Sequence, residues 1–291
     1  MEATRSDVLG QYRTISLKLK KRFLRKPNVA EASEQFGLLA KELQQQECPH
    51  YAAFCCLAVA RCEHTLGNAV GETQALVDGA RSFLEAEQQN HQLNCPSFDE
   101  HLNAAISCYN HAVKVHLEEK QPSLAASLCM ELGQTLRLLG KIKEATAHFQ
   151  KAAELLSHCV ADYLNVLDLV ASCKIQLGDY DGALNVLTEM SLVAEEQGVS
   201  PTDNHVFGVF ASLLAKIEVT RVLLLLLLQP SPQKLKSEHA ETLEKYTWEV
   251  DEVNNSAGYL CEDLFLLLQS LVMACQSCDI ETLKLLQKDL W

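Results

Sequence analysis

Breaks in helix-forming sequence recur at short intervals along this chain, and they constrain its fold more than any other feature. Between the breaks the sequence is rich in Leu, Ala, Glu, Gln and Lys, which lose little side-chain freedom in a helix. Runs of alternating apolar and polar residues, the mark of strands, are nearly absent. The pattern predicts an all-α fold of antiparallel helical hairpins, with helices of about five turns. We expect residues 1–291 to form a single domain.

Individual residues predict where the helices begin and end. Lys26 precedes a proline, which disfavours the helical backbone at that residue, so the first helix is expected to end near Arg25. Asn28 is expected to cap the second helix, with Glu31 in the capping-box position, and Pro49 to open the third. Further breaks are expected at Gly67–Gly71, Cys95–Pro96, Gln121–Pro122, Gly140, Gly178, Gly198–Asp203, Gln229–Pro232 and Trp248–Gly258.

Two of the expected hairpins repeat each other in the manner of tetratricopeptide units. After Gly140, Ala145 and Phe149 follow at the spacing of such a hairpin, in which small residues let paired helices approach and a large one fills the gap. Gly178 and Ala183 repeat this order 38 residues later, against a tetratricopeptide period of about 34. The repeats predict a tetratricopeptide-like α-solenoid, and two hairpins alike by chance would still give an antiparallel helical array. The predicted ranges are about 123–197 for the clearest repeat hairpins and about 232–291 for the C-terminal helices.

The longest apolar run, Val222–Leu228, is too short to span a bilayer. Extending it backwards takes in Lys216, Glu218 and Arg221, and each is costly at the centre of a spanning helix. The run therefore predicts a core helix, covered on all sides, and no transmembrane segment. Because the N-terminal sequence lacks the pattern of a secretory signal, the twelve cysteines are expected to be reduced thiols of a cytosolic protein.

No motif for catalysis or cofactor binding stands out. The phosphate-binding GxxxxGK[ST], the dinucleotide-binding GxGxxG, HExxH and GxSxG are all missing, so we predict a protein that is not an enzyme and holds no cofactor. Cys275 and Cys278, with Cys261 before them, are the strongest zinc or thiol candidates, but buried cysteine is the commoner case. The histidines on predicted helices share no acid or nucleophile at i+3 or i+4 and are expected to be surface or interhelical residues: His101, His111, His116, His148 and His158.

Charge is distributed unevenly along the chain. The net charge is −13, yet the basic segment, residues 1–27, carries +6, and the acidic segment, residues 238–263, carries −7. The basic helix could be a solvated end, an interfacial membrane helix or a docking surface for an acidic partner. Nucleic acid is disfavoured because the overall field would repel phosphates. The residues predicted to bind a partner are Arg13, Lys18, Lys21, Arg22, Arg25, Lys26, Glu249, Asp251 and Glu252.

Several long strings closely resemble the family of forty-kilodalton huntingtin-associated proteins, also called factor VIII intron-encoded proteins. The likeness runs in order from Arg13 to Trp291, and none of the strings is a catalytic motif. The strings are KLKKRFLRKPNVAEASEQF (Lys18–Phe36), YAAFCCLAVARC (Tyr51–Cys62), EVTRVLLLLLLQP (Glu218–Pro230), EHAETLEKY (Glu238–Tyr246) and EDLFLLLQSLVMA (Glu262–Ala274).

The resemblance implies a tetratricopeptide-like α-solenoid that binds and stabilises huntingtin, a larger helical-repeat protein. It also implies action with an early-endosomal Rab GTPase, recruitment of huntingtin to endosomes and altered endosome movement on the cytoskeleton. The expected locations are the cytoplasm, early endosomes and the nucleus. A general vesicle-trafficking adaptor or small-GTPase effector that acts without huntingtin is the alternative.

The sequence departs from the family in two places. Mammalian members carry a long proline-rich insertion where this chain has a short expected turn at Gly198–Asn204, so the insertion is expected to be dispensable for the fold. Family members also continue beyond the position of Trp291, so a C-terminal segment is expected to have been trimmed or lost.

Overall fold

A computed structural model describes residues 7–20, 27–198, 208–231, 233, 235–247 and 259–290. In these ranges every regular element is an α-helix, thirteen in all, which confirms the predicted all-α class. The chain divides into two compact units, residues 1–134 and 135–291. The expectation that residues 1–291 form a single domain stays a prediction.

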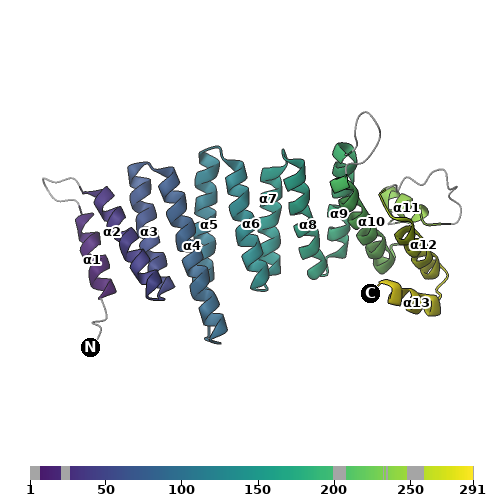
Figure 1. Cartoon of the computed structure of the whole chain (residues 1–291), viewed down its shortest axis with the longest axis horizontal. Helices are drawn as coiled ribbons and strands as arrows, with labels where there is room; N and C mark the ends of the chain where they lie inside the picture. Colours follow the sequence, from purple (N-terminus) through teal and green to yellow (C-terminus); the bar gives the residue numbers. More distant parts are fainter. Residues whose placement is uncertain are drawn as a thin grey trace. The chain divides into compact units, whose positions relative to one another are not determined.

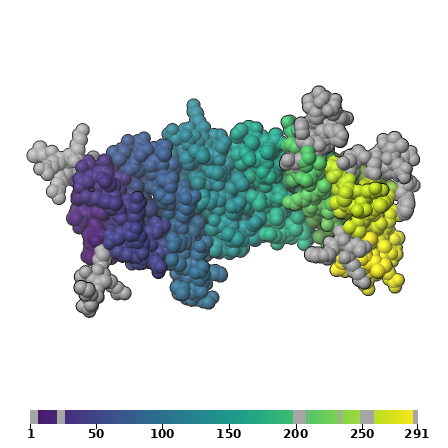
Figure 2. Space-filling view, in the orientation of Figure 1, coloured from purple at the N-terminus to yellow at the C-terminus, as the bar shows by residue number. Residues whose placement is uncertain are grey.

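Neighbouring helices of the first unit pack side by side in antiparallel order (Figure 1). Figure 2 shows the end of the longest helix, α4, projecting beyond its neighbours. The helices of this unit are α1 (Val8–Lys18), α2 (Val29–Gln45), α3 (Pro49–Leu66), α4 (Ala69–Gln92), α5 (Glu100–Glu118) and most of α6 (Pro122–Leu138).

The predicted helix starts in this unit are confirmed. Asn28 caps α2, since its Oδ1 accepts the Glu31 N–H at 3.2 Å, and its Nδ2 donates to the Glu31 carboxylate at 3.0 Å. Pro49 opens α3 as expected. α3 ends at Leu66, and the next residue, Gly67, has a φ of 71°, the left-handed conformation that glycine tolerates. Asn68 caps α4.

The predicted end of the first helix near Arg25 is wrong. α1 ends at Lys18, because the Leu19 and Lys20 N–H groups bond to carbonyls three residues back and tighten the chain into a turn. Ile15 on the inner face of α1 is buried, and the Tyr12 ring lies 5.0 Å from Phe36 of α2. The apolar face of α1 therefore packs on α2, and residues 21–26 lie outside the described ranges.

Small residues explain how α3 packs against a helix on each side. Ala52, Ala53, Ala58 and Ala60 are all buried, and alanine lets neighbouring backbones come close. α2 supplies the larger core side chains opposite them, among which Phe36 is almost completely buried. This close packing of α2 to α5 forms the framework of the site described below.

In the second unit, neighbouring helices from α7 to α10 pack in antiparallel order (Figure 1). Ala145 and Phe149 of α7 are fully buried, as the tetratricopeptide spacing predicted, and so is Ala152. Gly140 and Gly178 adopt φ values of +75° and +74° where helices end. These features confirm the tetratricopeptide-like α-solenoid class. The helices of this unit are α7 (Ile142–Leu156), α8 (Val160–Gln176), α9 (Tyr180–Gly198), α10 (Gly208–Leu228), α11 (Ser237–Glu244), α12 (Glu262–Gln276) and α13 (Ile280–Leu290).

The prediction that the leucine run would be covered on all sides is wrong. In α10, Val222 and Leu225 are buried, but Leu223 and Leu227 are 40% and 61% exposed. The two exposed leucines are four residues apart and share one helix face. α9, α11 and α12 pack on α10 and leave this face uncovered within the described part of the unit. No helix in the described ranges is long and apolar enough to cross a membrane.

Candidate functional site

Two of the predicted partner-binding residues, Arg13 and Lys18, lie in α1, and both are exposed. Lys18 Nζ donates to Glu31 Oε1 at 2.9 Å and to Gln35 Oε1 at 2.8 Å, so its charge ties α1 to α2. Lys18 also lowers the pKa of the Glu31 carboxyl. The other predicted residues lie outside the described ranges, namely Lys21, Arg22, Arg25, Lys26, Glu249, Asp251 and Glu252.

The outer face of α1 is a mixed apolar and basic stripe. Leu9, Arg13 and Leu17 are spaced four residues apart and are all exposed. No side-chain ion pair of Arg13 with another described residue is present. The docking role of the basic segment stays a prediction. The stripe formed by Leu9, Arg13 and Leu17 is the exposed surface of that segment that the structure describes.

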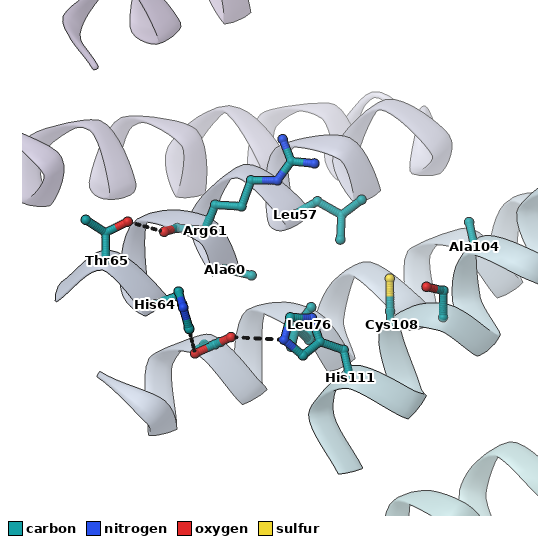
Figure 3. A pocket seen from close by; sticks show the side chains of 11 residues that line it. Leu57, Ala60, Arg61, His64, Thr65, Leu76, Ala104, Cys108 and His111 are labelled. Carbon is teal, nitrogen blue, oxygen red and sulfur yellow. Dashed lines mark hydrogen bonds and ion pairs between the residues drawn. The ribbon is translucent and has the colours of Figure 1, made fainter. Parts of the chain in front are cut away.

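A pocket of about 560 Å³ lies among α3, α4 and α5 of the first unit (Figure 3), and we call it the α3–α5 groove. Its floor comes from α4, where Glu72 and Leu76 are four residues apart and are both buried. Its walls are formed by Leu57, Arg61 and His64 of α3 and by Ala104, Cys108 and His111 of α5.

Helical spacing brings these wall residues to the groove. On α3 the wall positions are separated by four and three residues, and the same holds on α5, so each set lies on one helix face. Alanines at 60 and 104 leave space between the walls that larger side chains would fill. The groove is therefore a consequence of small residues on two helices that both pack against α4.

A buried carboxylate lies at one end of the groove. The Glu72 side chain is 5% exposed, His64 Nδ1 lies 2.9 Å from its Oε2, and His111 Nε2 lies 3.4 Å from its Oε1 (Figure 3). Glu72 is in the first turn of α4, where the helix dipole favours negative charge. Because an ionised carboxylate only accepts hydrogen bonds, Nδ1 of His64 is the donor in its contact with an ionised Glu72.

The two imidazoles each keep a second nitrogen for other partners. His64 and His111 are 72% and 53% exposed, and both line the groove. The expectation that His111 is an interhelical polar residue is confirmed. The carboxylate that His111 contacts was not predicted from the sequence, because Glu72 lies on a neighbouring helix. The one signal in the sequence was that Glu72 occupies a position of α4 whose helical spacing places it among buried residues.

Aromatic residues gather one turn beyond the groove, toward the starts of α3 and α5. The exposed ring of Phe54 meets the buried ring of Phe83 edge to face, with centroids 5.3 Å apart. Phe83 stacks on His101 at 6.1 Å, and His50 lies 6.1 Å from His101. Burial and the neighbouring His101 lower the pKa of His50. This end of the α3 and α5 faces is therefore lined by aromatic rings.

The cysteine candidates do not come together as a metal site. The described residues contain no group of three His, Cys, Asp or Glu side chains that could hold a metal ion. Cys55 and Cys108 are buried, as expected of small hydrophobic residues, and burial raises the pKa of each to about 11. Cys261 and Cys278 are exposed, so the buried role expected for cysteine is wrong at these two positions.

The groove residues lie in a part of the chain that matches a known protein family. Residues 21–196 match the soluble NSF attachment protein (SNAP) family. The 40-kDa huntingtin-associated proteins of Rattus norvegicus and Mus musculus are each 45% identical to the chain over 335 aligned positions. The alignments cover 98% of this chain and 88% of each relative. A crystal structure of BtubC (BKLC) from P. vanneervenii has a TM-score of 0.39 and 12% identity, and the match covers 94% of this chain and 93% of that one.

Proposed function

The chain belongs to the SNAP family and to the family of 40-kDa huntingtin-associated proteins, and from this premise we propose that it is a non-enzymatic adaptor that binds huntingtin. One observation carries the proposal: the 45% identity to the two named relatives extends over 98% of this chain. Identity of that extent includes both compact units, so the proposal concerns the whole chain rather than one hairpin.

The surface of the first unit supports an adaptor role. The α3–α5 groove combines apolar walls with a few charged groups, a composition typical of sites that hold a ligand or a peptide. The stripe formed by Leu9, Arg13 and Leu17 offers a second apolar and basic surface on α1. Exposed apolar residues beside charged ones are common where one protein docks on another.

Finer parts of the function rest on the resemblance of the sequence. We propose that the chain stabilises huntingtin and links it to early endosomes through a Rab GTPase, changing their movement on the cytoskeleton. Cytoplasm, early endosomes and nucleus are the proposed locations. Imaging of the tagged chain with an endosomal marker, in cells with and without huntingtin, tests this part.

Co-expression with huntingtin followed by size-exclusion chromatography tests the main proposal. We expect one co-eluting complex at moderate salt, and separate elution would overturn the proposal. A variant with Lys21, Arg22 and Arg25 changed to Glu is expected to bind more weakly. Unchanged affinity of that variant would show that the basic segment is a solvated end.

The exposed stripe on α1 also favours a second candidate, an adaptor that meets a membrane without huntingtin. Leu9 and Leu17 on either side of Arg13 could enter the boundary of an anionic bilayer. Sedimentation with anionic liposomes in the absence of any protein partner separates the candidates. The main proposal expects the chain to stay in the supernatant, whereas sedimentation that Leu9→Asp abolishes would support the second.

A further inference from the structure

We propose that the α3–α5 groove binds an extended segment of the partner in which an acidic side chain stands next to a large apolar one. The inference rests on the proposed function, because it identifies where and by what chemistry the adaptor recognises its partner. Three features of the groove support it: apolar walls, an accessible cation and two histidines with free ring nitrogens.

The apolar part of the groove fits a large side chain. Leu57 is half-buried on one wall, and Leu76 and Cys108 form buried apolar surface beneath it. The volume of about 560 Å³ is in the range of pockets that hold specific ligands. A leucine-sized or phenylalanine-sized side chain seated there would remove the exposed part of Leu57 from water, which favours binding.

The charge that the groove presents to solvent is positive. Arg61 is exposed and lies on the same face of α3 as Leu57 and His64. No ion pair of its guanidinium with another described residue is present. The acid that lines the groove, Glu72, is buried and already faces two imidazoles. The whole chain has a net charge of −13, so the exposed Arg61 is a local positive charge on an acidic protein. This charge favours an acidic side chain on the bound segment.

The two histidines favour an extended segment over a helix. Nδ1 of His64 lies 2.9 Å from Glu72, so when this nitrogen is the donor the neutral ring presents Nε2 as a hydrogen-bond acceptor. His111 turns Nε2 toward Glu72 at 3.4 Å, which leaves Nδ1 as its other ring nitrogen. An extended backbone has N–H groups free to donate to these nitrogens, whereas a helix uses its own N–H groups internally. Glu72 thereby acts as a positioning residue that orients both rings.

Three variants of the full chain test the groove against purified huntingtin by biolayer interferometry. Arg61→Glu reverses the accessible charge, and Ala104→Tyr fills the groove from a half-buried wall position, where a larger side chain enters the pocket rather than the core. Lys114→Glu is the matched control, since Lys114 is exposed on α5 and does not line the groove. Circular dichroism and the thermal midpoint verify that each variant is folded.

We expect Kd to rise at least about tenfold for Arg61→Glu and Ala104→Tyr and to stay within about twofold for Lys114→Glu, since loss of one well-placed contact changes affinity by that order. If the unmodified chain binds huntingtin and both groove variants bind equally well, the groove inference is overturned and the proposed function stands. If the unmodified chain does not bind, the proposed function itself fails. Equal weakening by Arg61→Glu and Lys114→Glu would also overturn the inference, because the effect would then be one of net charge.

Photo-crosslinking identifies the bound segment directly. A photoreactive phenylalanine analogue at Ser107, an exposed position that lines the groove on α5, is expected to crosslink to a huntingtin segment that contains Asp or Glu close to a large apolar residue. Crosslinking to a basic segment, or to a helix, would contradict the proposed chemistry of the groove. The same analogue at position 114 provides the control for non-specific capture.

Discussion

Removal of the buried carboxylate of Glu218 in α10 should destabilise the second unit far more than a typical substitution. Glu218 is 1% exposed, and its Oε2 lies 3.6 Å from Nη1 of Arg221, whose side chain is 7% exposed. Lys245 Nζ and the Tyr246 hydroxyl each lie 3.4 Å from its Oε1. Arg221 Nε is buried and has no hydrogen-bond partner among the described residues. Arg221 thus depends on Glu218 for its charge compensation.

The expected magnitudes follow from this asymmetry. Glu218→Leu leaves the Arg221 cation buried without a partner, which costs about 3 to 5 kcal/mol. Arg221→Met should cost less, about 1 to 2 kcal/mol, because Glu218 keeps Lys245 and Tyr246 as partners. The double variant removes both charges but leaves the buried Tyr246 hydroxyl without its acceptor, so it should cost about 1 to 2 kcal/mol, less than Glu218→Leu alone.

Urea unfolding followed by far-ultraviolet circular dichroism measures these differences, because the regular structure of the described residues is helical. With a slope of about 2 kcal/mol per molar urea, Glu218→Leu should lower the midpoint by about 1.5 to 2.5 M. A change of less than about 0.5 kcal/mol for Glu218→Leu would refute the reasoning. So would a double variant whose loss equals the sum of the two single losses, since coupled charges are not additive.

Three further perturbations test the fold. Gly140→Ala should destabilise the fold by about 1 to 2 kcal/mol, because the φ of Gly140 is +75°. Gly37→Ala, inside α2 and with no atom near the added Cβ, should stabilise the fold by about 0.5 to 1 kcal/mol. Thermal midpoints of the two variants that move in the same direction would contradict this expectation. Tyr109→Phe should lower the free energy of unfolding, measured by urea titration, by about 1 to 2 kcal/mol, because the buried hydroxyl donates to Glu131 at 2.8 Å. An unchanged free energy of unfolding would show that this bond contributes nothing. Burial and a nearby lysine lower the pKa of His148 in the folded chain, so the unfolded chain binds the proton more readily. The stability that the neutral ring contributes should therefore be full above about pH 6.5 and fall below it. In urea titrations at several pH values, His148→Gln should flatten this decline.

Features set by neighbouring residues could be predicted from the sequence. The all-α class, the Asn28 cap, the start of α3 at Pro49 and the breaks between helices at Gly140 and Gly178 are all present. Each depends on backbone chemistry within a few residues, such as the missing N–H of proline or the missing Cβ of glycine. The resemblance of long strings likewise indicated the family that the comparisons show.

Tertiary structure decided what lies between helices. Periodicity could not show that one face of α10 stays open at Leu223 and Leu227, since this depends on where α9, α11 and α12 pack. Nor could it show that Glu72 joins His64 and His111, which lie on three different helices. The sequence by itself determined the helices and the family of this protein, because local backbone preferences and long shared strings are read along the chain. Only packing decided the groove and its charges, because side chains that are distant in sequence meet there through the placement of whole helices.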